Sequence, residues 1–251
     1  MKLCVPIPCF FGKLPFESAV EKVSNAGYNL AEIYSWKSLD LESAAAALDR
    51  FGVTLVSMCT SEFRLTDPAC RELWVKGVRE SCAAAKILGA RKLITQVGPD
   101  TGAGREEQHK SIVEGLKAGA PILEEAGVTV MIEPLNTKFN HPGYYLTSSA
   151  EAFDIVREVG SPNVKVVFDI YHQQISEGNI IPNVTNNLDL IAHLHAAGHP
   201  GRHELQFGES DYRNIFAAID LAGYDGCCGL EYKPLLDPAE SLVRARELYG
   251  N

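Results

Sequence analysis

Short apolar runs rich in β-branched residues alternate with longer amphipathic stretches along the whole chain. The short runs predict buried β-strands, and the longer stretches, in which apolar residues recur every three or four positions, predict helices. Because strands and helices alternate, the pattern favours a parallel sheet built from βα units. The predicted strands cover residues 2–8, 29–35, 53–60, 91–98, 128–136, 163–172, 191–195 and 227–234.

The predicted helices carry start and stop signals at their ends. The segment "PFESAVEKVSNAG" begins with Pro and ends with Gly, as helices often do. The segments "NAGYNLAEI", "EAGVTVMI" and "LAGYDGCCGLEY" share an Ala-Gly pair shortly before a strand, and such a Gly suits a left-handed helix C-cap. The predicted helices cover residues 15–27, 41–52, about 67–89, about 105–127, 148–160, 211–226 and 237–250.

Eight predicted strands alternating with helices predict an α/β protein with a (β/α)8 TIM-barrel fold, in which residues 1–251 form a single domain. The alternative is a doubly wound open sheet. Such a sheet normally has a glycine-rich phosphate loop after its first strand, and this sequence has none there. The segment "GPDTGAG" after the fourth strand lacks the Lys-Ser/Thr of a P-loop, and we interpret it as a flexible active-site loop.

Four consecutive predicted strands end in side chains of the kinds that bind metals. These strand-end residues are Glu133, Asp169, His195 and Glu231. The active site of a barrel lies at the C-terminal ends of its strands. Side chains two positions apart on a strand share a face, so we expect the four to point into the barrel mouth. Ile132, Phe168 and Leu230 would then face the helix layer.

Three carboxylates and one imidazole in close proximity would repel one another or shift their pKa values, and a divalent cation resolves the conflict. Oxygen ligands with one nitrogen suit Mg²⁺, Mn²⁺ or Co²⁺, with Zn²⁺ as a further option. We therefore expect one divalent metal ion as the cofactor, held by Glu133, Asp169, His195 and Glu231.

The segments "MIEPLN", "FDIYHQQ", "AHLHAAGHPGRHE" and "GLEYKP", in this order and spacing, resemble the hydroxypyruvate isomerase family. This family is a branch of the xylose-isomerase-like sugar isomerases and epimerases, and the resemblance covers essentially the whole chain. It implies a single divalent metal at the four strand-end residues. It also implies that Glu133 and Glu231 are the catalytic acid/base pair. Members of this family often assemble as dimers or tetramers, so the resemblance adds a homo-oligomer as an expectation and leaves the number of subunits open.

Two features of the motifs point to different branches of this group. Hydroxypyruvate isomerases usually carry Gln at the position of His195, whereas ketose 3-epimerases carry His there and an Asp-x-x-His like Asp169–His172. Arg202, in "GRHE", instead favours the hydroxypyruvate branch. A guanidinium matches a carboxylate bidentately, so Arg202 is a candidate clamp for an acidic substrate. His172, placed in the loop after the sixth strand, is a candidate ligand for a substrate oxygen.

An α-hydroxy carbonyl compound bound to a cation has an acidified C–H next to its carbonyl group. One glutamate could remove this proton, and the resulting enediolate could be reprotonated on the neighbouring carbon or on the same carbon. The first outcome is an aldose–ketose isomerisation, which for hydroxypyruvate gives tartronate semialdehyde. The second outcome is an epimerisation, and a ketose 3-epimerase acting on a free sugar is the alternative hypothesis.

Other candidates in these motifs have simpler interpretations. We interpret His193, one layer deeper than His195, as a packed and hydrogen-bonded core histidine rather than a ligand. Glu204 could orient the loop that carries Arg202. Asn136, after the fifth strand, is interpreted mainly as a loop residue. The aromatic residues near the first two strands either wall the pocket or pack in the core, and these are Phe10, Phe11 and Trp36.

Charge and composition narrow the expected partners. The chain of 251 residues has a net charge of −9 and no block of like charges, which argues against a binder of duplex nucleic acid. An endonuclease, another activity of this superfamily, would need a basic face and more His and Asp ligands. No run approaches the ~18 apolar residues of a membrane span. We therefore expect a small sugar or hydroxy-oxo acid as the partner, with neither nucleic acid nor a membrane.

The cysteines and the N-terminus predict a cytoplasmic protein. The seven cysteines are scattered without a C-x-x-C motif, which is typical of reduced thiols. Pro6 and Pro8 interrupt the first apolar stretch, so we expect no secretory signal there.

Overall fold

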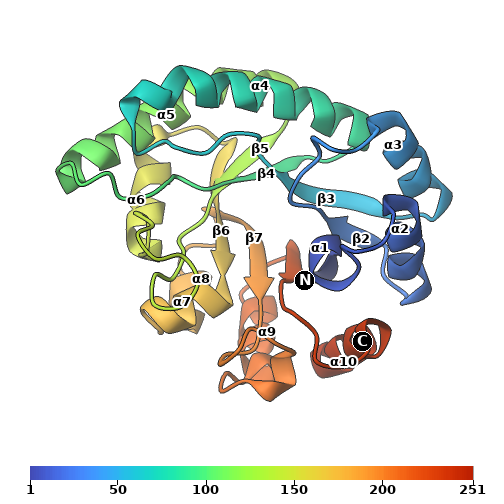
Figure 1. Cartoon of the computed structure of the whole chain (residues 1–251). Coiled ribbons are helices and arrows are strands. Elements are labelled where there is room, and N and C mark those ends of the chain that lie inside the picture. Colours follow the sequence, from blue (N-terminus) through green and yellow to red (C-terminus); the bar gives the residue numbers. More distant parts are fainter. Residues whose placement is uncertain (251) are drawn as a thin grey trace.

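The computed structural model describes residues 1–250 and shows eight parallel strands closed into a barrel in chain order (Figure 1). Each strand pairs with the next one in sequence, and the last strand pairs with the first. The predicted (β/α)8 barrel is thus confirmed over the open sheet. The strands are β1 Lys2–Pro6, β2 Leu30–Glu32, β3 Thr54–Cys59, β4 Lys92–Thr95, β5 Thr129–Ile132, β6 Val164–Asp169, β7 Ile191–Ala196 and β8 Cys227–Leu230.

The helices lie outside the ring of strands (Figure 1). Gly89, Gly127 and Gly160 follow three of them at positive φ, as expected for glycine C-caps. The helices are α1 Ile7–Phe10, α2 Phe16–Asn25, α3 Leu41–Arg50, the 3₁₀ turn η1 Pro68–Cys70, α4 Arg71–Leu88, α5 Arg105–Ala126, α6 Ser149–Val159, α7 Ile170–Ser176, α8 Ile180–Thr185, the 3₁₀ turn η2 Leu205–Phe207, α9 Tyr212–Leu221 and α10 Pro238–Tyr249.

Seven of the eight observed strands are shorter than predicted, and two of these end early because a helix begins directly at their C-terminal ends. Residues 7 and 8 belong to α1, and residues 170–172 belong to α7. The predicted placement of His172 in a loop is therefore wrong. Asp169 caps α7, because its Oδ1 accepts hydrogen bonds from the backbone N–H groups of Tyr171 and His172. A short apolar run does not by itself distinguish a strand from a buried helical turn.

Two separate hydrophobic clusters follow the alternation of side chains along the strands. Met131 and Val167 form a small cluster with Ile94 inside the barrel. Ile132, Phe168 and Leu230 belong to the large core between the strands and the helices, as predicted. Glu133 and Asp169, each two residues beyond a member of the inner cluster, consequently point toward the barrel mouth.

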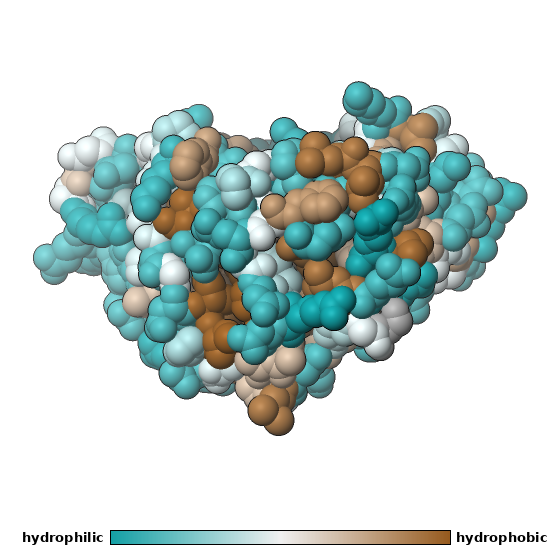
Figure 2. Space-filling view, turned by 90° about the horizontal axis from the view of Figure 1, so that it is seen from below, coloured by the Kyte–Doolittle hydropathy of each residue, from teal (hydrophilic) through white to brown (hydrophobic). Residues whose placement is uncertain are grey.

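Hydrogen bonds tie the N-terminal residue to α9 and α10. The Met1 ammonium donates to Asp220, and the Tyr249 hydroxyl donates to the Met1 carbonyl. The face shown in Figure 2 is mostly hydrophilic, with separate hydrophobic patches. Within residues 1–250, no helix has the length and apolar character needed to cross a membrane. All seven cysteines are free thiols, as expected.

Candidate active site

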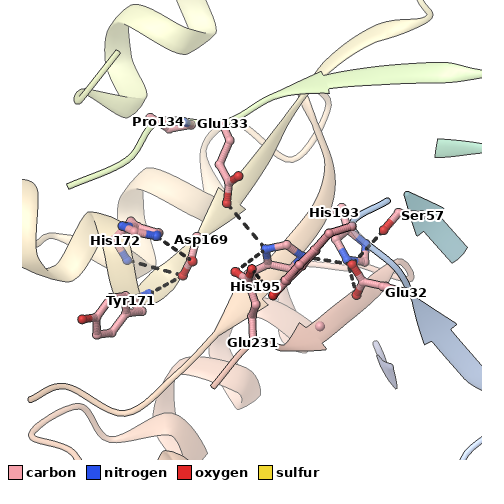
Figure 3. Close-up of polar contacts among 12 residues, drawn as sticks. Glu32, Ser57, Glu133, Pro134, Asp169, Tyr171, His172, His193, His195 and Glu231 are labelled. Atoms are coloured by element: carbon pink, nitrogen blue, oxygen red, sulfur yellow. Dashed lines mark hydrogen bonds and ion pairs between the residues drawn. The ribbon is translucent and has the colours of Figure 1, made fainter. Parts of the chain in front are cut away.

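Four side chains from the second half of the barrel meet at the C-terminal ends of their strands (Figure 3). Glu133 follows β5 directly, Asp169 ends β6, His195 is the penultimate residue of β7, and Glu231 follows β8 directly. One potential ligand atom from each lies within 4.8 Å of the others. Glu231 is partly exposed and the other three are buried. The structure thus brings the four strand-end residues together in one cluster, which we call the mouth cluster.

Asp169 uses its two oxygens for different tasks. Oδ1 caps α7, at 2.8 Å from the backbone nitrogen of Tyr171. Oδ2 faces the mouth cluster and lies 3.2 Å from Nη2 of Arg202. Burial raises the pKa of Asp169 to about 7, although the Arg202 guanidinium works against this shift. The carboxylate therefore both starts a helix and supplies an oxygen to the site.

Glu231 is held as an anion by three neighbours. Its Oε1 accepts a hydrogen bond from the Tyr34 hydroxyl at 2.7 Å. Its Oε2 lies 2.6 Å from Nη2 of Arg202 and 3.0 Å from Nδ1 of His195. Burial alone would raise the pKa of Glu231, but His195 and Arg202 outweigh burial and hold that pKa well below its usual value.

Glu133 has the opposite electrostatic environment. Burial raises the pKa of Glu133; the nearby charge of Glu231 adds to the rise, while a contact with His195 opposes it. Two carboxyl groups whose environments push their pKa values apart are suited to separate acid and base roles. In this pair Glu231 is the ionised member, and Glu133 is the member that holds a proton more readily.

His195 links the mouth cluster to a carboxylate deeper in the barrel. Its Nε2 lies 3.1 Å from Oε2 of Glu32, the last residue of β2. Its Nδ1 lies 3.0 Å from Glu231 and 3.6 Å from Glu133, yet makes no hydrogen bond within residues 1–250. A buried ring nitrogen without a hydrogen bond, facing carboxylate oxygens, suits a nitrogen that ligates a cation.

The charges and donor types of the mouth cluster fit a divalent metal ion. Glu133, Asp169 and Glu231 bring three carboxyl groups together, and Arg202 supplies one fixed positive charge. Carboxylate oxygens with one imidazole nitrogen are ligands for divalent cations, and a cation would neutralise the remaining negative charge. The four residues that would hold the ion are the four strand-end residues.

His172, on α7, points Nε2 of its ring toward Asp169 of the mouth cluster (Figure 3). Its Nδ1 accepts a hydrogen bond from the backbone N–H of Asn136 at 3.1 Å. The proton of the neutral ring is therefore on Nε2, which lies 3.5 Å from Oδ2 of Asp169 and has no hydrogen-bond partner within residues 1–250. Burial holds the pKa of His172 well below its usual value. This N–H is available to a substrate oxygen, and Asn136 keeps it so.

Arg202 reaches the mouth cluster from the segment after β7. Its backbone adopts a positive φ of 58°, and its guanidinium lies over the ring of Tyr171 at 5.1 Å. Its Nε donates to the backbone oxygen of Glu231 at 3.1 Å. Glu204 fastens the same segment, because its carboxylate accepts hydrogen bonds from the backbone N–H groups of Leu235 and Leu236. Glu204 thus anchors the loop of Arg202, as the sequence predicted.

A cavity of about 760 Å³ opens above the mouth cluster. His172 and Arg202 line it together with three of the four cluster residues. Trp36 walls this cavity, whereas Phe10 and Phe11 pack in the core. Residues 98–104 are absent from the lining within the described chain, so the interpretation of "GPDTGAG" as an active-site loop is wrong. Gln108 and Asp100 instead hold this segment through hydrogen bonds.

Sequence reasoning missed two residues of the site, Glu32 and Tyr34. Both come from the end of the second strand, where Glu32 is a carboxylate at the tip of an apolar run and Tyr34 follows two positions later. The strand-end rule that selected Glu133 and Asp169 applies equally to Glu32. The short, weakly apolar second strand hid this signal.

Comparison with known proteins places the chain in a family. A family described as xylose isomerase-like TIM barrel matches residues 20–248. The chain belongs to the xylose isomerase-like TIM-barrel family. A hydroxypyruvate isomerase of Escherichia coli K12 is 30% identical to this chain over 243 residues. The match covers 93% of this chain and 94% of the relative.

Two further proteins that are similar to this chain have names that describe different activities. A 2-oxo-tetronate isomerase of Cupriavidus necator is 41% identical over 132 residues, covering 53% of this chain and 50% of the relative. A crystal structure titled AP endonuclease, family 2, from Brucella melitensis superposes with a TM-score of 0.93 at 26% identity. That match covers 98% of this chain and 99% of the other.

Proposed function

We propose that this protein is a metal-dependent isomerase of small hydroxy-oxo acids that converts hydroxypyruvate into tartronate semialdehyde. The observation that carries the proposal is the guanidinium of Arg202, held over Asp169 and Glu231 beside the proposed acid/base pair. Relatives named hydroxypyruvate isomerase and 2-oxo-tetronate isomerase support an acidic substrate. A bound divalent metal would polarise the substrate carbonyl group and acidify the adjacent C–H.

The residues divide the remaining work. Glu231, held ionised by Arg202 and His195, would remove the carbon-bound proton, and Glu133, whose pKa is raised by burial, would deliver a proton to the neighbouring carbon. The proton of the substrate hydroxyl group would pass to the former carbonyl oxygen, which completes the exchange of the two groups. The Nε2–H of His172 would bind a substrate oxygen. Arg202 would pair with the substrate carboxylate, since guanidinium and carboxylate groups form charge-assisted hydrogen bonds.

The second candidate function is a ketose 3-epimerase acting on a free sugar. His195 favours it, because the related ketose epimerases carry histidine where hydroxypyruvate isomerases usually carry glutamine. The same glutamates would then act on one carbon from opposite faces. An epimerase has no substrate carboxylate for Arg202 to bind, so this candidate ranks second.

The similarity to a structure titled AP endonuclease does not carry over to the proposal. The chain has a net charge of −9, whereas a DNA-binding face is usually basic. Within residues 1–250, His, Cys, Asp and Glu side chains that could hold a metal form only the mouth cluster and a second, fully buried group at Glu32. The substrate class best matched to this site is a small acid.

Proton NMR in D₂O tests the proposal directly. Mn²⁺- or Mg²⁺-loaded protein is incubated in parallel with hydroxypyruvate, 2-oxo-tetronate and a free ketose, with product spectra taken after removal of the metal. We expect conversion of hydroxypyruvate, with deuterium entering the product carbon. Glu133→Gln and Glu231→Gln should each lower kcat by about 10²–10⁴-fold, the usual contribution of an acid or base.

The other outcomes are equally informative. A new epimer of the ketose with deuterium at C3 would favour the epimerase instead. Turnover of 2-oxo-tetronate alone would keep the reaction type and change the substrate. Binding of metal without conversion of any of the three compounds would refute the catalytic proposal for this class of substrates.

A further inference from the structure

We propose that Glu32 is a positioning residue that orients the ring of His195 and fixes the tautomer whose Nδ1 faces the mouth cluster. This inference deepens the proposed function, because His195 is a ligand only if a metal binds there. Glu32 lies outside the four segments that carry the family resemblance. It is 1% exposed, at the end of β2 and across the barrel from β7.

The carboxylate of Glu32 accepts four hydrogen bonds, and Figure 3 labels three of the donor residues, Ser57, His193 and His195. Its Oε2 lies 3.1 Å from Nε2 of His195 and 2.7 Å from Oγ of Ser57. Its Oε1 lies 3.0 Å from Nε2 of His193 and 2.8 Å from Sγ of Cys4. An ionised carboxylate offers about four acceptor sites, so these donors occupy all of them. Each donor is buried as well, so none of them is open to bulk water.

The contact with Glu32 assigns the proton that His195 keeps when it binds a metal. A ligating imidazole is neutral, with one N–H and one lone pair. Because Nε2 donates to Glu32, the proton that leaves is the one on Nδ1, and the lone pair of Nδ1 then faces Glu231 and Glu133. A carboxylate behind a ligating histidine fixes the ring and raises its basicity, and removing such a partner typically costs about 10–100-fold in metal affinity.

His193 has a different place in the same network. It donates to Oε1 of Glu32, and its ring packs edge-on against that of His195 at 5.1 Å. It is fully buried and is not part of the mouth cluster. The interpretation of His193 as a hydrogen-bonded core residue agrees with this position. Glu32 consequently links the core residue His193 to His195 of the mouth cluster by hydrogen bonds.

Calorimetric titration of the full chain with Mn²⁺ tests the positioning role. Glu32→Gln keeps the shape but removes the negative charge of the carboxylate, so the hydrogen bond from Nε2 of His195 is weakened or lost whichever way the amide points. We expect the Mn²⁺ affinity to fall by about 10–100-fold with an unchanged stoichiometry of one ion. Ser57→Ala is the matched control, since it removes another donor to the same oxygen without touching His195. Its Mn²⁺ affinity should stay close to that of the wild type.

A double-mutant cycle separates positioning from a general loss of stability. In a His195→Gln background there is no ring to orient, so adding Glu32→Gln should leave the Mn²⁺ affinity nearly unchanged. Full additivity in the cycle would overturn the proposal, as would wild-type affinity in Glu32→Gln. A second Mn²⁺ that binds to the wild type and is lost in Glu32→Gln would also overturn it, because Glu32 would then be a ligand.

The tautomer of His195 can be measured in the wild type. This measurement tests the proposal even where Glu32→Gln does not fold. Long-range ¹H–¹⁵N spectra of the Mg²⁺-loaded full chain, labelled at histidine, should show His195 protonated on Nε2, with the signal assigned by its loss in His195→Gln. A proton on Nδ1 would overturn the proposal. If the wild type binds neither Mg²⁺ nor Mn²⁺, the metal centre of the proposed function fails. The tautomer of the metal-free ring, read at a pH high enough to make His195 neutral, then decides the role of Glu32.

Discussion

At the scale of single residues, Arg202 takes part in both the proposed metal binding and the proposed substrate binding. Its guanidinium pairs with Asp169 and Glu231, two of the four proposed metal ligands, while it is also the proposed partner of the substrate carboxylate. A cation entering the mouth cluster and the guanidinium thus compete for the same carboxylates. Substrate, once bound, offers the guanidinium another anion to pair with.

This competition predicts opposite effects of Arg202→Gln on metal and substrate. Mn²⁺ should bind at least as tightly as to the wild type, because two carboxylates lose a competing cation. kcat/KM for hydroxypyruvate should fall by about 10–100-fold, the equivalent of one hydrogen-bonded charge pair. Titration calorimetry and steady-state kinetics measure the two quantities on the same sample.

Lys37→Gln is the matched control for the loss of positive charge. Lys37 also lines the cavity, but it pairs with Glu62 at 3.4 Å and is half exposed. Its removal should leave both quantities nearly unchanged. Weaker Mn²⁺ binding in Arg202→Gln, or equal losses in the two variants, would contradict the role given to Arg202.

Some residues of the site could be predicted from the sequence and others could not, for physical reasons. Glu133, Asp169, His195 and Glu231 follow apolar runs, so the barrel rule alone was enough to group them. The dual role of Asp169 was not visible, since it depends on α7 beginning at the next residue. The contact of Tyr34 with Glu231 joins residues 197 positions apart, and no local pattern reports such a pairing.

At the scale of elements, β8 approaches the buried carboxylate more closely than a side chain would allow. A Cβ added at Gly229 would lie 2.8 Å from Cδ2 of His195 and closer still to Oε1 of Glu32. The glycine in this strand therefore marks a place where backbone and buried side chains come together. The position of β8 and the network around Glu32 depend on each other.

Gly229→Ala should accordingly disturb both stability and metal binding. We expect a loss of about 1–3 kcal/mol in the free energy of unfolding from overpacking. We also expect weaker Mn²⁺ binding, because His195 must move. Denaturant unfolding and calorimetric titration check the two effects. Gly104→Ala is the control, since Gly104 has a negative φ and nothing within 4 Å of the added Cβ. Unchanged Mn²⁺ affinity in Gly229→Ala would show that β8 does not constrain His195.

At the scale of the whole molecule, the mouth cluster draws on four neighbouring strands. β5, β6, β7 and β8 each contribute one of its residues, and β2 contributes Glu32 from across the barrel. The order of strands was predictable, because repeated βα units leave few arrangements other than a closed barrel. The contact between Glu32 of β2 and His195 of β7 was not predictable in this way. The two strands lie far apart in the sequence, and their side chains meet only inside the closed barrel.

A metal that joins four strands should stabilise the folded barrel, and the gain should depend on pH. Burial raises the pKa of Asp169 to about 7, and the carboxylates of Glu231 and Glu32 overcome burial to raise that of His195 well above its usual value. Both groups must lose protons to bind a metal, so its affinity rises as pH rises through about 7. A metal at 100 times its Kd adds about 2.7 kcal/mol to the free energy of unfolding.

Scanning calorimetry with Mn²⁺ or EDTA measures this linkage. At one fixed Mn²⁺ concentration, the increase in Tm over the EDTA sample should be larger at about pH 8 than at about pH 6. Asp169→Asn is the matched variant, because an asparagine still caps α7 but does not titrate. Its Tm increase should vary less with pH than that of the wild type. The same increase at both pH values in the wild type would mean that the mouth cluster takes up the metal without releasing protons, against the buried carboxyl and imidazolium groups described above.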